Sequence, residues 1–141
     1  MIYTTLTKKA LRMAFDAHKN QTDKTGLPYV FHPFHLAEQM DTEEEVITAL
    51  LHDIVEDTDL TLEDLRVCGF PDRVLAALSL LTHQDGIDYM DYIETIRSDP
   101  LAARVKLADL RHNSDLTRWD TVDGKTRQRQ EKYMKAMERL R

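Results

Sequence analysis

The sequence predicts an all-α protein, folded as a single compact helical bundle over residues 1–141. Apolar residues recur three and four positions apart along almost the whole chain, the spacing that gathers them on one face of an α-helix. Glycine and proline, which interrupt helices, number only four each. A chain of 141 residues is also about the size of one domain with its own core.

The first two predicted helices flank a loop that contains glycine and proline. Thr4 or Thr5 can cap a first helix, because a threonine hydroxyl accepts a hydrogen bond from the first turn, and this helix should end near Asn20. Pro33 suits the first position of a short second helix through residues 34–40, since its fixed φ angle fits a helix start.

The third helix has the clearest start signal. Thr42 and Glu45 have the spacing of a capping box, and the three glutamates of the first turn favour the positive end of the helix dipole. We expect this helix to run through Asp57.

The rest of the chain carries further helical patterns, with Thr61 as a start signal, Gly69 as a terminator and Pro71 opening the next helix. These helices are expected over residues 61–68, 71–81, 89–97, 100–116 and 125–141. The last one has an apolar stripe that predicts either core packing or a homodimer face, formed by Tyr133, Met134, Met137 and Leu140.

Composition excludes several classes of function. The net charge is −6, and no block of lysine and arginine is long enough to bind the backbone of a nucleic-acid duplex. No apolar run reaches the roughly 18 residues of a membrane span. The first residues lack the apolar stretch and the cleavage site of a signal peptide, so we expect a cytoplasmic protein.

The segment "LLHDIVED", residues 50–57, places four ionisable side chains in apolar surroundings: His52, Asp53, Glu56 and Asp57. Buried charge is costly unless it is paired or coordinates a metal, so a divalent cation would explain the pattern. The alternative is that His52 belongs to the core and the three acids face water.

Two further segments offer ligands. His32 directly precedes Pro33, and Asp109 follows an apolar helix face in "VKLAD". Together with His52 and Asp53 they would form a site of two imidazoles and two carboxylates. Four ligands fill a tetrahedral zinc ion, whereas six-coordinate Mn²⁺ keeps two positions for water or substrate. A catalytic site therefore favours Mn²⁺, although another divalent cation is possible.

The order of these residues resembles the HD superfamily of metal-dependent phosphohydrolases. More narrowly, "AHKNQTDKTGLPYVFHP", "ALLHDIVEDTDLTLEDL" and "RVKLADLRHNSDL" resemble the hydrolase domain of the RelA/SpoT group, which removes the 3′-pyrophosphate from the guanosine alarmone (p)ppGpp. This resemblance implies an all-helical HD-domain bundle that uses Mn²⁺ and acts on a small phosphorylated nucleotide.

Carried over by position, the resemblance implies metal ligands and a catalytic pair. The implied ligands are His32, His52, Asp53 and Asp109. Glu56 and Asp57 would orient and deprotonate a water that attacks the phosphorus of a phosphoanhydride or phosphoester.

The same resemblance implies substrate contacts. Lys24 corresponds to a basic loop residue that contacts phosphate or base, and Asn113 to an asparagine near the nucleoside. Lys106 and Arg111 are candidate phosphate partners, or else solvated residues of the helix surface.

The chain departs from the family pattern at Thr22 and Asp23, where arginines usually precede the lysine. The sequence therefore leaves open whether guanine is recognised. Three alternatives to an alarmone hydrolase remain: an HD-domain hydrolase of another nucleotide or phosphate ester, a non-catalytic regulatory module that binds metal, and a helical protein-interaction domain that uses the apolar stripe of the last helix.

Overall fold

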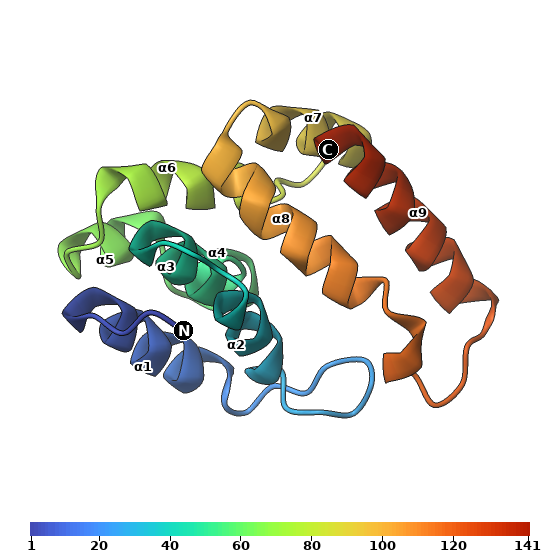
Figure 1. The fold of residues 1–141 in the computed structure, drawn as a ribbon, viewed down its shortest axis with the longest axis horizontal. Coiled ribbons are helices and arrows are strands. Elements are labelled where there is room, and N and C mark those ends of the chain that lie inside the picture. The colour runs from blue at the N-terminus through green and yellow to red at the C-terminus, as the bar shows by residue number, and fades with distance from the viewer.

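The computed structural model describes residues 1–141 and is entirely helical, with nine α-helices, one 3₁₀ helix and no strand (Figure 1). This confirms the all-α prediction. The elements are α1 (Thr5–His18), α2 (Phe31–Glu38), α3 (Glu43–Leu51), α4 (Ile54–Asp57), α5 (Leu62–Val67), α6 (Asp72–Leu81), α7 (Tyr89–Arg97), α8 (Pro100–Asn113), η1 (Leu116–Arg118) and α9 (Gly124–Leu140).

Threonine side chains cap the helices at the positions that the sequence predicts. Thr4 accepts a hydrogen bond from the backbone N–H of Thr7 at the start of α1. Thr42 accepts one from Glu45 at the start of α3, but the Glu45 carboxylate bonds the N–H of Asp41, so only half of the expected capping box forms.

Helix α2 begins at Phe31, two residues before the expected start. Pro33 therefore occupies the third helical position. This is tolerated because the N–H groups of the first turn have no acceptor within a helix, so the missing N–H of proline removes no bond.

The third predicted helix is not continuous. It ends at Leu51, and a separate short helix, α4, begins at Ile54. Nδ1 of His52 lies 2.7 Å from the carbonyl oxygen of Ala49, the oxygen that an unbroken helix would pair with the N–H of Asp53. Expecting this helix to reach Asp57 was wrong, and the break lies at the His52–Asp53 pair.

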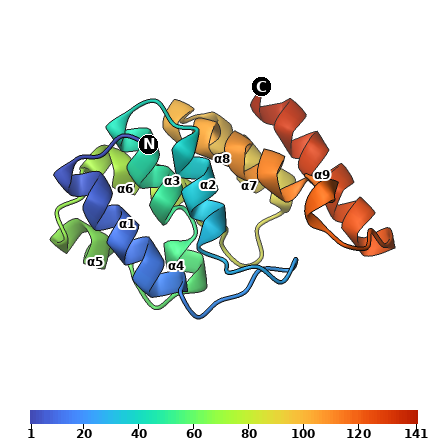
Figure 2. The ribbon, with the colours of Figure 1, turned by 60° about the horizontal axis from the view of Figure 1, so that its bottom comes forward.

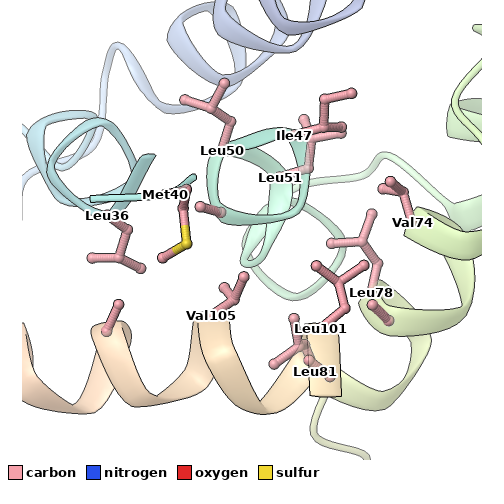
Figure 3. Packing of buried hydrophobic residues seen from close by; sticks show 14 of the residues in the cluster. Leu36, Met40, Ile47, Leu50, Leu51, Val74, Leu78, Leu81, Leu101 and Val105 are labelled. Atoms are coloured by element: carbon pink, nitrogen blue, oxygen red, sulfur yellow. The ribbon is translucent and has the colours of Figure 1, made fainter. Parts of the chain in front are cut away.

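The hydrophobic core gathers around α3. This helix packs against α1, α2, α6 and α8. In Figure 3, Leu50 of α3 points towards α1, while Leu78 of α6 and Val105 of α8 point towards α3. The labelled core side chains are Leu36, Met40, Ile47, Leu50, Leu51, Val74, Leu78, Leu81, Leu101 and Val105.

Helix α8 joins two groups of helices. It contacts α2, α3 and α6 on one side and α7 and α9 on the other, as Figures 1 and 2 both show. The predicted apolar stripe of α9 supplies Met137 and Leu140 to the core, whereas Met134 stays 47% exposed. No helix is both long enough and apolar enough to span a bilayer.

Leu51 offers a test of this packing, because its side chain is fully buried directly before the break in the third predicted helix. Replacing it with alanine leaves a cavity and should lower the free energy of unfolding by about 2–5 kcal/mol, measured by urea denaturation. The matched control is Val67→Ala on α5, where the side chain is 79% exposed and the change should be small. Equal losses in the two variants would contradict the assigned core.

Candidate metal centre and active site

Three helices bring two imidazoles and a carboxylate together in the interior. His32 comes from α2, His52 from the end of α3 and Asp109 from α8, and all three are buried. One possible ligand atom from each lies within 4.8 Å of the others. The structure therefore assembles three of the four predicted ligands into a candidate metal site.

The His52 ring is held in one orientation by the backbone. A carbonyl oxygen can only accept, so Nδ1–H of His52 donates to Ala49, and in a neutral ring Nε2 then carries the lone pair. Carboxylate oxygens of Asp53 and Asp109 lie 2.9 and 3.7 Å from this buried Nε2. Neither oxygen is aligned with the ring for a hydrogen bond, so Nε2 has no hydrogen-bond partner.

His32 is oriented by a second histidine. Its Nε2 lies 2.9 Å from Oδ1 of Asp109, and its Nδ1 lies 2.7 Å from Nδ1 of His112. Burial, together with the nearby charge of His32, lowers the pKa of His112 to about 3. His112 therefore stays neutral and can accept the Nδ1–H of His32, which directs Nε2 of His32 towards Asp109.

Asp109 is held as a carboxylate. Burial opposes its charge, but Lys106 and the two histidines keep the pKa of Asp109 well below its usual value. Nζ of Lys106 lies 2.9 Å from Oδ2, and Nδ2 of Asn113 donates to Oδ1 at 2.9 Å. The ammonium and the amide thus fix this carboxylate beside the imidazoles.

Asp53, the fourth predicted ligand, lies at the edge of this cluster and outside the mutual distance of 4.8 Å. Its Oδ2 is 2.9 Å from Nε2 of His52 and accepts a hydrogen bond from the hydroxyl of Tyr29. Burial opposes its charge, yet the neighbouring His52 lowers the pKa of Asp53 to about 2.

This donor set fits a divalent cation. Without a cation, the Asp53 and Asp109 carboxylates outweigh burial and raise the pKa of His52 well above its ordinary value, so a proton must sit between acceptors. A cation in that place would take over from this proton and contact Nε2 of His52 and both carboxylates at once. A backbone carbonyl that orients a ligating histidine, as Ala49 orients His52, is typical of metal sites.

Glu56 and Asp57 lie on α4 and line the same cavity as His32, Asp53 and Asp109, whereas His52 lies behind its wall. The Glu56 carboxylate accepts a hydrogen bond from the backbone N–H of His83. Burial raises the pKa of Glu56, and burial together with the charge of Asp53 raises the pKa of Asp57. A raised pKa makes each carboxylate a stronger base.

The cavity has a volume of about 500 Å³ and is mostly polar. It is lined by Lys24, Lys106 and Asn113, which the sequence singles out as substrate contacts. Arg111 is exposed on α8 and does not line it.

Sequence reasoning missed several residues of the cavity and its support. Tyr29 lies in the turn just before α2, three residues ahead of His32, and its hydroxyl donates to Asp53. Arg118 forms an ion pair with Asp23, which lies 95 residues away along the chain, and no local sequence pattern predicts such a contact. The residues that the sequence gives no role are Tyr29, Arg118 and Arg129. From the sequence, Tyr133 is expected in the apolar stripe of the last helix, His112 is expected to orient a neighbouring side chain, and Trp119 is expected either to pack between helices or to wall a base-binding pocket.

Comparisons with known proteins agree with this geometry. No protein-family model matches the chain. The chain is 33% identical over 114 residues to a guanosine-3′,5′-bis(diphosphate) 3′-pyrophosphohydrolase of Aquifex aeolicus, a match that covers 72% of this chain and 16% of that protein. It is 31% identical over 121 residues to the bifunctional (p)ppGpp synthase/hydrolase SpoT of Escherichia coli, covering 75% and 17%. The chain thus spans less than a fifth of the length of these relatives.

A solved structure extends the likeness to the fold. It belongs to a metazoan orthologue of SpoT that is described as hydrolysing ppGpp. The two chains superimpose with a TM-score of 0.77 at 26% sequence identity, over 99% of this chain and 85% of that one. The protein is therefore a homologue of the hydrolase region of SpoT/RelA-type proteins and has the HD-domain fold.

Proposed function

We propose that the protein is a Mn²⁺-dependent phosphohydrolase that removes the 3′-diphosphate from guanosine 3′,5′-bis(diphosphate). The observation that carries the proposal is the buried cluster of His32, His52 and Asp109, which opens beside an acidic pair into a cavity lined with cations. Relatives named for this reaction support the choice of substrate. Residues 1–141 would act as one hydrolase domain in the cytoplasm.

The metal would be held by His32, His52, Asp53 and Asp109. When bound, a divalent cation supplies Lewis acidity, which lowers the pKa of water and neutralises charge on phosphoryl oxygens. Two imidazoles with two carboxylates suit Mn²⁺, and other divalent cations bind similar sites.

The acidic pair would act on the attacking water. Glu56, held by the N–H of His83, and Asp57 orient the water and take its proton. The water oxygen bonds to the phosphorus next to the ribose, the bond between that phosphorus and O3′ breaks, and the products are a nucleoside 3′-hydroxyl and diphosphate.

Cations in the cavity would bind the substrate phosphates. Lys106 also holds Asp109 and so belongs to the end near the metal. Lys24 is exposed on the loop before α2 and makes no ion pair, so its ammonium group is available to phosphate. Arg129 of α9 lines the same cavity, and Asn113 would lie near the nucleoside. Arg111 has no part in this arrangement.

A hydrolase of the same chemistry that acts on another nucleotide is the second candidate. The observation that favours it is Asp23, an acid that lines the cavity where relatives usually carry a positive residue. Assay of guanosine 3′,5′-bis(diphosphate) beside a panel of nucleotides, with and without Mn²⁺, separates the two candidates. If only a different nucleotide is hydrolysed, the alarmone is ruled out as the substrate.

Metal binding should depend on the buried cluster. A divalent cation at 100 times its dissociation constant should stabilise the protein by about 2.7 kcal/mol, measured as a rise in the melting temperature with Mn²⁺. The variants His52→Ala and Asp109→Ala should lose this stabilisation. Asp59→Ala, an exposed acid outside the cavity, is the control and should keep it. Full stabilisation of Asp109→Ala by Mn²⁺ would contradict the assigned ligands.

Catalysis should depend on Glu56 and Asp57, whereas metal binding should not. Glu56→Gln and Asp57→Asn should each lower kcat by about 100-fold or more, because the proton acceptor is lost. Metal content, measured by elemental analysis, should stay unchanged. Asp59→Asn, an exposed acid outside the cavity, is the control and should retain activity.

If wild-type protein binds Mn²⁺ but hydrolyses no phosphorylated nucleotide, the protein is a regulatory module that binds metal and not an enzyme. Loss of metal in Glu56→Gln would instead make Glu56 a ligand.

A further inference from the structure

The part of the cavity formed by the loop before α2 and by η1 differs in chemistry from the metal end. It is formed by residues 22–25 together with Arg118 and Trp119. In Figure 1 the loop between α1 and α2 reaches towards the short η1 helix, which follows α8. These two segments, distant in sequence, meet through the ion pair of Asp23 and Arg118.

Arg118 is held in one position by two acceptors. Its Nη2 lies 3.1 Å from Oδ2 of Asp23, and its Nη1 donates to the carbonyl oxygen of His112 at 3.0 Å. The two charged side chains are only 14% and 11% exposed. With its charge balanced by Asp23, this guanidinium is a less effective phosphate clamp than Lys24, which has no ion partner.

The fixed guanidinium lies over an aromatic ring. Its central carbon is 5.4 Å from the centroid of the Trp119 ring, within the range of a cation–π contact. Both residues line the cavity, so a guanidinium group and an indole ring are within reach of a ligand that enters it. Nucleobases stack on aromatic rings and on guanidinium planes.

The other aromatic side chains of the cavity are placed differently. Tyr29 is packed between the rings of His18 and His32, at centroid distances of 4.9 and 5.7 Å, and its hydroxyl bonds Asp53. Tyr133 lies on α9. Trp119 is therefore the aromatic residue that stands beside the loop, away from the metal ligands.

Asp23 is engaged by four hydrogen bonds from the protein. One oxygen accepts from the backbone N–H groups of Thr25 and Leu27 and from the Thr25 hydroxyl, and the other accepts from Arg118. The side chain is only 11% exposed, so its main contacts are with the loop and with the guanidinium. Its role is to hold the loop and to position Arg118.

We infer that Arg118 and Trp119 form a stacking platform for the nucleobase of the substrate, with Asp23 as the residue that positions it. This inference rests on the proposed function for the reaction but concerns binding alone. A stacking platform reads the flat face of a base rather than its edge, so it should serve guanine and adenine alike.

Fluorescence tests the platform without catalysis, because Trp119 is the single tryptophan of the chain. GDP and ADP should each quench its emission to saturation. Phosphoribosyl pyrophosphate, which carries ribose and phosphates but no base, should bind without quenching. Binding of GDP, measured by calorimetry, with no change in emission would overturn the inference. So would equal quenching by the base-free probe, or failure of both nucleotides to bind.

Kinetics test the same platform in the reaction. Trp119→Ala should raise KM for guanosine 3′,5′-bis(diphosphate) and for its adenosine counterpart by the same factor, about tenfold or more, with kcat nearly unchanged. Trp119→Phe should recover most of the loss. Phe15→Ala, an exposed aromatic outside this cavity, is the control and should leave KM unchanged. An unchanged KM in Trp119→Ala would overturn the platform.

The ion pair is tested by reversal. Asp23→Arg and Arg118→Asp should each raise KM, and the double variant should recover part of the loss because the pair is restored with opposite polarity. Absence of any recovery would overturn the positioning role of Asp23. If the wild-type protein hydrolyses no 3′-diphosphate, the proposed function fails, and the fluorescence result still decides the platform.

Discussion

The structure depends on one electrostatic constraint: the carboxylates of Asp53 and Asp109 both face Nε2 of His52. His52 and Asp109 are buried and Asp53 is half-buried, so little water reaches these groups, and in the absence of a cation a proton on His52 must lie between the two carboxylates. Lys106 balances only part of this charge, because its ammonium group pairs with Asp109 and not with Asp53. The constraint is relieved when a cation takes the position between the acceptors, and the surrounding helices are arranged around that position.

The break between α3 and α4 and the central placement of α8 both serve this cluster. The break lets His52 use the Ala49 carbonyl as a partner and turns Asp53 towards Tyr29, while α4 carries Glu56 and Asp57 to the cavity wall. Helix α8 packs between the two groups of helices, so Asp109 meets His32 and His52 inside the protein. Support from backbone and neighbouring side chains gives the ligands fixed directions, which a site for chemistry requires.

Much of this arrangement could be predicted from the sequence, because it follows from local patterns. Helical spacing and threonine caps placed the helices, and charged residues among leucines marked the segment of His52. The break at His52 could not be predicted, since it arises from a side chain that competes with the backbone for one carbonyl oxygen. The partners of Asp23 and His32 also escaped prediction: Arg118 lies 95 residues and His112 lies 80 residues away along the chain, and only the folded backbone brings them together.

Anomalous diffraction from crystals grown with Mn²⁺ tests the central claim most directly, because it locates the ion without reference to activity. We expect a single strong peak within coordination distance of Nε2 of His32, Nε2 of His52 and the carboxylates of Asp53 and Asp109. A peak held by surface acids, or none between these four side chains, would contradict the claim that they form a metal centre.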